Sequence, residues 1–214
     1  MVCVSIGCVS VDECLKILKN VEFAEIRIDR MGIGIEEVRK IFSSHTNLIA
    51  TCRDPSIPHE KRKELLIEAL ESGASYVDVD IFTPTQSLLR IQKKAKEKGS
   101  KVIVSYHDFE KTGSFSELKG ILEMCLSFGD YGKISCMVRK DEDNLNLLRL
   151  LKVPEFKNRT IVTGMGEKGK LTRVLSLLLG SPFTFASYEE GKETAEGQIE
   201  RTVIKGIMEL FFEK

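Results

Sequence analysis

Short segments rich in β-branched and aromatic residues alternate with amphipathic stretches along the whole chain. We expect strands at residues 2–7, 23–29, 47–53, 75–81, 101–107, 132–138, 159–165 and 183–188. Their starts lie about 20 to 30 residues apart, which is the length of one strand–helix unit. Eight such units predict an α/β fold, a (β/α)8 TIM barrel of eight parallel strands forming a single domain over residues 1–214. A doubly wound open sheet is the alternative, although it usually has five or six strands.

Residues that start and stop helices support these boundaries. Ser10 and Ser114 stand where N-cap residues are expected, each with a glutamate three positions later. Pro58 and Pro84 each precede a helical stretch that ends at a glycine. We expect a last helix over residues 197–212.

One face of several predicted strands is polar, whereas the strands of a parallel sheet are usually apolar on both faces. Alternate side chains of a barrel strand point outward to the helices and inward to the barrel axis. Because the face that packs on helices must be apolar, the polar face is predicted to point inward. It comprises Ser5, Glu25, Arg27, Asp29, Thr51, Arg53, Asp78, Asp80, Ser105, His107, Lys133, Ser135 and Met137. Charge in an interior favours a ligand site, and a salt-bridge network without a ligand is the alternative.

Lys133 and His107 are the candidates for chemistry. A lysine desolvated inside a barrel is shifted towards the neutral amine, which attacks carbonyls and forms Schiff bases. The alternative is a lysine whose amine extends to the solvent at the bottom of the barrel. His107 stands at the carboxyl end of its strand, where barrel enzymes carry catalytic groups, and suits proton transfer near neutral pH. His45 and His59 are expected at the surface.

Three arginines are candidates for holding a carboxylate or a phosphate, because a guanidinium binds such groups in a bidentate manner. They are Arg27, Arg53 and Arg173. Arg173 follows a glycine-rich turn after the seventh strand, a region where barrels often bind phosphate. The turn lacks the G-K-[ST] ending of a P-loop, so it is a weak signal by itself.

Composition narrows the classes of function. The 214 residues include 32 basic and 32 acidic side chains, so no global field favours nucleic acid or an anionic membrane. The chain shows no signal peptide and no run of about 18 apolar residues, which predicts a cytoplasmic protein without a membrane span. The six cysteines form no C-x-x-C pair and only three histidines occur, so we expect reduced thiols and no metal site.

Seven segments, in the same order along the chain, resemble motifs of the type I 3-dehydroquinate dehydratase family. They are EIRID (25–29), ATCRD (50–54), YVDVDIF (76–82), VSYHDF (104–109), GKISCMV (132–138), GMGEKGKLTR (164–173) and FTFASYEEGKETAEGQI (183–199). The resemblance covers nearly the whole chain and agrees with the barrel.

The resemblance implies dehydration of the small molecule 3-dehydroquinate to 3-dehydroshikimate, a step of the shikimate pathway, without a cofactor. Lys133 would form an iminium with the C3 ketone. His107 would remove the C2 proton and then protonate the leaving C1 hydroxyl in a syn elimination. The resemblance further implies a homodimer and a substrate-binding set of Ser5, Glu25, Arg27, Arg53, Arg173, Thr194 and Gln198.

The chain departs from the family motifs at several positions. The E-G-G turn after the third strand, whose glutamate partners the catalytic histidine, is absent, and Glu60 would replace it only if the loop folds back. Thr194 and Thr172 stand where the family has serine, Glu196 where it has proline, and Asp80 where it has glutamate. Two other functions stay open, namely a Schiff-base aldolase acting on a phosphorylated sugar and a non-catalytic barrel that binds a small molecule.

Overall fold

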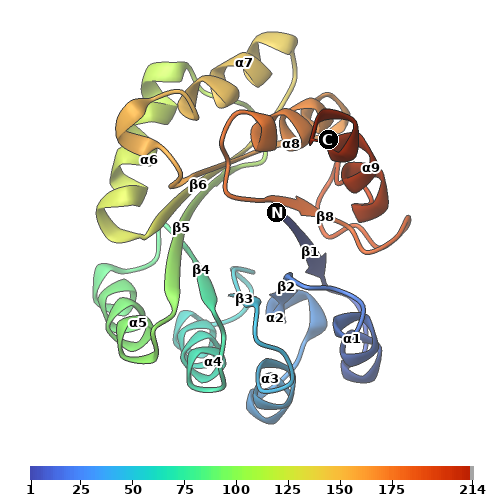
Figure 1. Cartoon of the computed structure of the whole chain (residues 1–214). Coiled ribbons are helices and arrows are strands. Elements are labelled where there is room, and N and C mark those ends of the chain that lie inside the picture. Colours follow the sequence, from blue (N-terminus) through green and yellow to red (C-terminus); the bar gives the residue numbers. More distant parts are fainter. Residues whose placement is uncertain (213–214) are drawn as a thin grey trace.

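Eight parallel strands surround a common axis, and helices cover their outer side (Figure 1). The computed structural model describes residues 1–212. The strands are β1 (Val2–Ile6), β2 (Ala24–Arg27), β3 (Leu48–Thr51), β4 (Tyr76–Asp80), β5 (Lys101–Asp108), β6 (Tyr131–Met137), β7 (Thr160–Met165) and β8 (Thr184–Ala186). The predicted (β/α)8 barrel is confirmed, and the open-sheet alternative is wrong.

Backbone pairing runs in the order β7-β6-β5-β4-β3-β2-β1-β8, and every pair is parallel. Within the described residues, no backbone ladder joins β7 to β8. The barrel is therefore nearly closed, with one seam between these two strands. This seam lies beside the turn that leads into the helix carrying Arg173.

The helices lie between successive strands or follow the last one. They are α1 (Val11–Leu18), α2 (Ile28–Met31), α3 (Ile35–Phe42), α4 (His59–Glu71), α5 (Thr85–Lys98), α6 (Phe115–Phe128), α7 (Asp141–Leu150), α8 (Lys170–Leu178) and α9 (Arg201–Phe212), with short 3₁₀ turns η1 (Pro154–Phe156) and η2 (Glu167–Gly169). The hydroxyls of Ser10 and Ser114 accept the backbone N–H of the residue three positions on, as expected of N-caps.

The predicted start of the last helix is wrong, because α9 begins at Arg201 and not at residue 197. Gly197 has a φ of 75°, a left-handed conformation that a helix does not continue through. Its Cα also lies close to Gly166, and a Cβ at position 197 would approach the Gly166 carbonyl oxygen to 2.3 Å. Residues 187–200 are instead a loop over the carboxyl ends of the strands.

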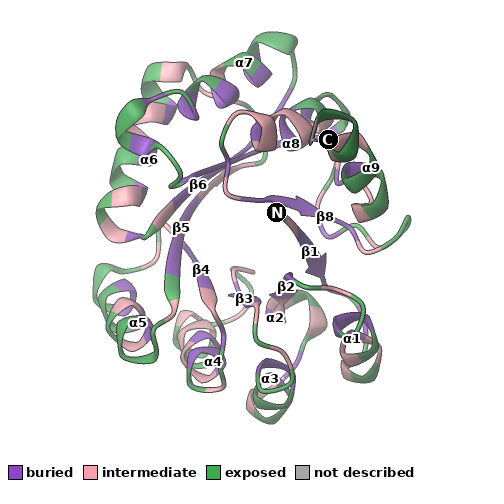
Figure 2. Ribbon diagram, viewed as in Figure 1, coloured by how far each residue is buried: buried purple, intermediate pink, exposed green. Residues whose placement is uncertain are grey.

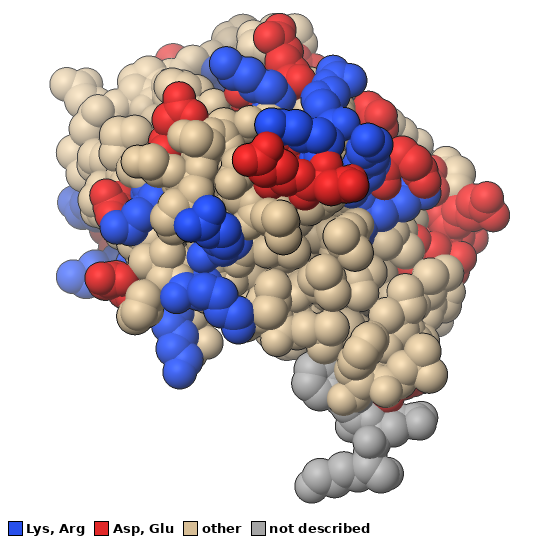
Figure 3. All heavy atoms as spheres, turned by 90° about the horizontal axis from the view of Figure 1, so that it is seen from above, with Lys and Arg blue, Asp and Glu red and all other residues tan. Residues whose placement is uncertain are grey.

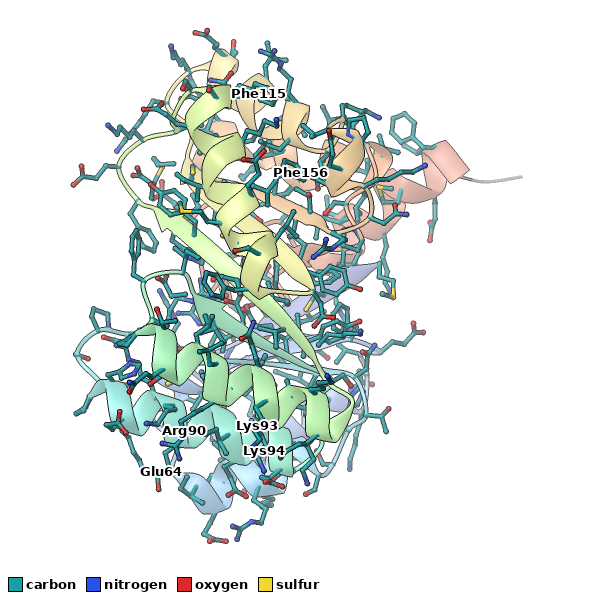
Figure 4. The ribbon with its side chains drawn as sticks, turned by 90° about the vertical axis from the view of Figure 1, so that its left-hand side faces the viewer. Glu64, Arg90, Lys93, Lys94, Phe115 and Phe156 are labelled. Atoms are coloured by element: carbon teal, nitrogen blue, oxygen red, sulfur yellow. The ribbon has the colours of Figure 1, made fainter. Side chains whose placement is uncertain are left out.

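The outward faces of the strands and the inward faces of the helices form the main apolar core, and the strands are almost continuously buried (Figure 2). The helices turn charged side chains outward, as Glu64 of α4 and Arg90 and Lys93 of α5 show (Figure 4). Lys94 of α5 bridges to Glu71 of α4 at 2.5 Å, so neighbouring helices also interact through their polar faces.

The barrel interior has two different halves. At the amino ends of the strands it is filled by an apolar cluster that we call the aromatic floor, composed of Cys3, Phe23, Ile49, Tyr76, Ile103, Tyr131, Ile161, Phe183 and Phe185. Phe183 contacts Phe23 edge-to-face with ring centroids 5.0 Å apart, a favourable aromatic geometry. The predicted inward polar face is thus confirmed for the half at the carboxyl ends only.

Acidic and basic side chains lie next to one another on the surface (Figure 3), as a net charge of zero suggests. Within residues 1–212, no helix is long and apolar enough to cross a membrane. The six cysteines are free thiols. The expectation of two surface histidines needs correction, since both are half-buried: His45 hydrogen-bonds with the Val21 carbonyl and His59 Nε2 lies 2.8 Å from the Ser87 hydroxyl.

Candidate active site

Most of the predicted site residues meet at one cavity of about 230 Å³, which opens at the carboxyl ends of the strands. The predicted residues that line it are Glu25, Arg27, Arg53, His107, Lys133, Arg173, Thr194 and Gln198. Ser5 does not line the cavity and lies behind Glu25, whose carboxylate accepts its hydroxyl at 2.5 Å. Eight side chains from residues far apart in the sequence thus surround a space for a small polar molecule.

Lys133 lies inside the barrel on β6 with only 4% of its surface exposed. Its Nζ donates to Asp78 Oδ2 of β4 at 2.8 Å and lies 4.0 Å from the centroid of the Phe185 ring. The side chain therefore does not extend to the solvent at the bottom of the barrel. It rests on the edge of the aromatic floor with its nitrogen at the bottom of the cavity.

Asp78 is the main counter-ion of the cavity, although sequence reasoning did not single it out. Its carboxylate is completely buried and contacts Lys133, Arg53 Nη2 at 2.9 Å and the Ser105 hydroxyl at 2.6 Å. Burial alone would raise the pKa of Asp78, but the nearby cations Arg53 and Lys133 outweigh it and hold this pKa below its usual range. A fixed negative charge therefore lies beside the lysine. The inward position of Asp78 on the alternating fourth strand was the available signal.

His107 stands beside Lys133 at the end of β5, with its imidazole against the Arg53 guanidinium. The ring stacks on Phe109 at a centroid distance of 6.0 Å. Burial lowers the pKa of His107 to about 4, and the positive charge of Arg53 adds to this effect. The imidazole is therefore neutral at physiological pH, and its unprotonated ring nitrogen accepts from the Arg53 guanidinium.

The carboxylate partner of His107 is Asp80, whose Oδ2 lies 3.8 Å from the ring Nδ1. The suggestion that Glu60 replaces the missing glutamate is wrong. Glu60 is exposed at the start of α4 and pairs with Lys63 one turn further along that helix. Asp80 reaches the ring because it lies on the strand next to β5, with the same inward phase as Asp78.

Glu25 connects the cavity to the loop after β8. Its carboxylate accepts the hydroxyls of Ser5 and Thr51, the latter at 2.8 Å. Ser5 also lies 2.6 Å from the Thr194 hydroxyl, and Gln198 donates its amide to Thr194 at 3.1 Å. Although burial opposes it, the charges of Lys133 and Arg27 lower the pKa of Glu25. The loop over the cavity is thus linked through Ser5 to an ionised carboxylate inside the barrel.

The two remaining arginines differ in their partners. Arg27 is paired in a bidentate manner with Asp29, at 2.9 and 3.1 Å. Arg173 of α8 is 1% exposed and forms no ion pair within the described residues. Its guanidinium reaches only the carbonyl oxygens of Phe185 at 3.5 Å and Glu196 at 3.3 Å, and burial lowers its pKa to about 10. The charge of Glu25 acts on Arg173 from a distance, but no carboxylate is in direct contact with it among the described residues, and a buried cation of this kind facing a cavity is suited to bind an anion.

Sequence reasoning missed other residues that line the cavity. Thr163 and Met165 come from β7, Phe109 from the segment after β5, and Ser135 and Met137 from β6. The inward phase pointed to Ser135 and Met137, but nothing local marked Thr163 as a site residue. Within residues 1–212, no group of three His, Cys, Asp or Glu side chains is placed to hold a metal ion.

Comparisons with known proteins agree on one family. A family model described as type I 3-dehydroquinase matches residues 2–214. The 3-dehydroquinate dehydratase of Methanocaldococcus jannaschii is 35% identical over 220 residues, which cover 98% of both chains. Among solved structures, type I 3-dehydroquinate dehydratase from Clostridium difficile with covalent modified comenic acid superimposes with a TM-score of 0.86 at 25% identity, covering 98% of this chain and 91% of that one. The 3-dehydroquinate dehydratase of Aquifex aeolicus gives 0.83 at 25% identity, with full coverage of both.

Proposed function

The chain belongs to the type I 3-dehydroquinase family, and from that premise we propose that it eliminates water from 3-dehydroquinate to give 3-dehydroshikimate. It would then be a hydro-lyase of the shikimate pathway, which leads to chorismate and the aromatic amino acids. The observation that carries the proposal is the juxtaposition of Lys133, neutral His107 and unpaired Arg173 around one cavity.

The first step is the attack of the Lys133 amine on the C3 ketone. The carbonyl oxygen leaves as water, and a positively charged iminium replaces the ammonium. Asp78, now 2.8 Å from Nζ, supports the proposal because its charge would stabilise the iminium in place. His107 is the neighbouring base that would take up the proton released by the attacking amine and return it to the carbonyl oxygen that leaves as water, so the imidazole is neutral again before the second step.

The second step is proton transfer by His107. The iminium withdraws electrons from C2, so the C2 proton becomes acidic enough for a neutral imidazole to remove. The resulting imidazolium would then protonate the C1 hydroxyl, which leaves as water. Because the same imidazole removes the C2 proton and protonates the C1 hydroxyl, both would leave from the same face of the substrate ring, and the elimination would be syn. Asp80 would orient the ring.

The substrate carboxylate would bind Arg173, with Gln198 beside it. Glu25, Arg27 and Arg53 would hold ring hydroxyls, and the Ser5–Thr194 contact would keep the loop over the substrate. The reaction as written needs no metal or organic cofactor. A cytoplasmic homodimer is part of the proposal on family grounds alone.

Reductive trapping tests the proposal directly. Borohydride added together with 3-dehydroquinate should inactivate the protein and add one reduced ligand at Lys133, as read by peptide mass spectrometry. Lys133→Met is the matched control and should stay unlabelled. An unlabelled wild-type protein that nevertheless forms the conjugated enone product, followed by its ultraviolet absorbance, would contradict the Schiff base. Cleavage of phosphorylated sugars without enone formation would favour an aldolase.

A further inference from the structure

Three side chains on neighbouring strands form a row along the cavity wall. His107 of β5 is paired in register with Ser135 of β6, and Ser135 with Thr163 of β7. All three line the same cavity as Lys133. Neighbouring strands lie about 4.8 Å apart, so adjacent members of the row are close enough to contact one small ligand atom. The row lies one inward position beyond Lys133 and Ile161 towards the carboxyl ends.

Within residues 1–212, the hydroxyls of Ser135 and Thr163 have no hydrogen-bond partner. Thr163 is 5% exposed, and its Oγ1 is buried without a hydrogen bond within residues 1–212. Ser135 is 3% exposed, and its side chain makes no hydrogen bond to any described residue. A buried hydroxyl without a partner destabilises the folded protein, and a ligand that supplies the partner removes this penalty. Because both hydroxyls also line the cavity, a ligand bound there can supply their missing partner.

The position of the row identifies the ligand atom concerned, if the proposed function holds. The residue after Thr163, Gly164, donates its backbone N–H to Thr172, the neighbour of Arg173, at 2.8 Å. The row thus extends from the proton donor His107 to β7, the strand that packs against α8, which carries the arginine that would bind the carboxylate. In 3-dehydroquinate the carboxylate and the departing hydroxyl share carbon C1. The hydroxyl that His107 protonates would therefore lie along this row.

We propose that Ser135 and Thr163 bind the C1 oxygen as it leaves. The C1–O bond breaks with its electron pair going to oxygen, and the His107 imidazolium supplies the proton that completes water. The electron pair left at C2 forms the C1=C2 double bond. Ser135 and Thr163 donate hydrogen bonds to the oxygen while its negative charge develops, and then to the released water. Such donors accelerate a reaction when they bind the developing charge more tightly than the ground state.

Ser135→Ala and Thr163→Val test this role without changing the lysine or the histidine. Each should lower the single-turnover rate of elimination about tenfold, since a hydrogen bond to developing charge is worth roughly 1.5 kcal/mol or more. The product 3-dehydroshikimate lacks the C1 oxygen. Its affinity, and the yield of borohydride trapping at Lys133 with product, should therefore stay within about twofold of wild type.

Thr184→Val is the matched control. Thr184 of β8 is also a fully buried threonine whose hydroxyl has no hydrogen bond within the described residues, but it does not line the cavity. This variant should keep the wild-type elimination rate and trapping yield. Comparing Thr163→Val with Thr184→Val thus distinguishes the general effect of losing a buried hydroxyl from the effect of losing one at the C1 oxygen.

The outcomes distinguish this inference from the proposed function. Wild-type protein that does not convert 3-dehydroquinate overturns both. Conversion by wild type with unchanged elimination rates in both variants overturns only the role of the row. A fall in product trapping that parallels the fall in rate also overturns it, because a merely structural defect produces that result. Slow elimination with intact product trapping supports it.

Discussion

The two halves of the barrel interior are built on the same strands but differ in what they bury: one half buries apolar rings and the other buries charged groups. The aromatic floor packs rings such as Phe183 and Phe23 against one another and leaves little polar surface to satisfy. The half at the carboxyl ends buries Lys133, Asp78 and Arg173 at a cost that only partners can offset. Part of that need stays unmet inside the protein, at Arg173 and at two hydroxyls. Unsatisfied groups also occur elsewhere, as at Thr184, so it is their position around one cavity that distinguishes the half proposed to bind a ligand.

The largest effect is expected from Lys133→Met. Loss of the Lys133 amine at the bottom of the cavity should remove the covalent route and lower kcat by about 10⁴-fold or more. Arg53 still pairs with Asp78, so the carboxylate keeps a cation and the fold should persist. Enone absorbance gives the rate and circular dichroism the fold. Residual turnover above about 1% of wild type would contradict a nucleophilic lysine.

A substitution in the aromatic floor should have the opposite effect to Lys133→Met, lowering the stability of the fold while leaving catalysis nearly unchanged. Phe183→Ala removes a 1% exposed ring that packs on Phe23, Tyr76, Tyr131 and Phe185, and should lower the free energy of unfolding by about 3–5 kcal/mol. Urea denaturation measures this loss. Because no reacting atom touches Phe183, kcat per folded molecule should stay within a few-fold of wild type. A hundredfold loss of kcat in fully folded protein would show that the two halves are not separable.

Arg173→Met tests whether a charged residue in the half at the carboxyl ends of the strands contributes to substrate binding or to the stability of the fold. Loss of a charge-assisted hydrogen bond to the substrate carboxylate is worth about 1.5–3 kcal/mol, so KM should rise roughly 10- to 150-fold. Thermal stability should be unchanged or higher, because the arginine is a buried cation that forms no ion pair within residues 1–212 and whose burial outweighs the charge of Glu25. Thermal unfolding of the free protein checks this. A clearly less stable variant would mean that Arg173 serves the fold rather than the ligand.

The smallest expected effect is a shift of the pH dependence of kcat/KM towards acid. The pKa of His107 is lowered to about 4, so the base is already neutral well below pH 7. The catalytic efficiency kcat/KM should stay level from neutral pH down to about pH 5, then fall tenfold per pH unit below about pH 4. An exposed histidine would give this midpoint near pH 6.5. A midpoint there would show that Arg53 and burial do not control the ring. Circular dichroism at each pH controls for acid unfolding.

Much of this architecture could be predicted from local patterns. The repeat of strand and helix determined the number of units, and the alternation within each strand determined which side chains turn inward. Lys133 and His107 could therefore be placed in one interior from the sequence, whereas Arg173 was a candidate from the turn that precedes it and from the family resemblance. These properties depend on neighbours along the chain, which the sequence displays directly.

Contacts between distant strands were decided by the tertiary structure. The partner of His107 is Asp80 rather than Glu60, Asp78 joins Lys133 to Arg53, and Thr163 completes the row beside Ser135. These pairings depend on the register between strands and on the stagger of the barrel, to which side chains many residues apart contribute together. The sequence by itself determined which chemical groups enter the barrel. Only the packed barrel decided which of them meet and which remain unpaired, because that depends on the geometry of all eight strands.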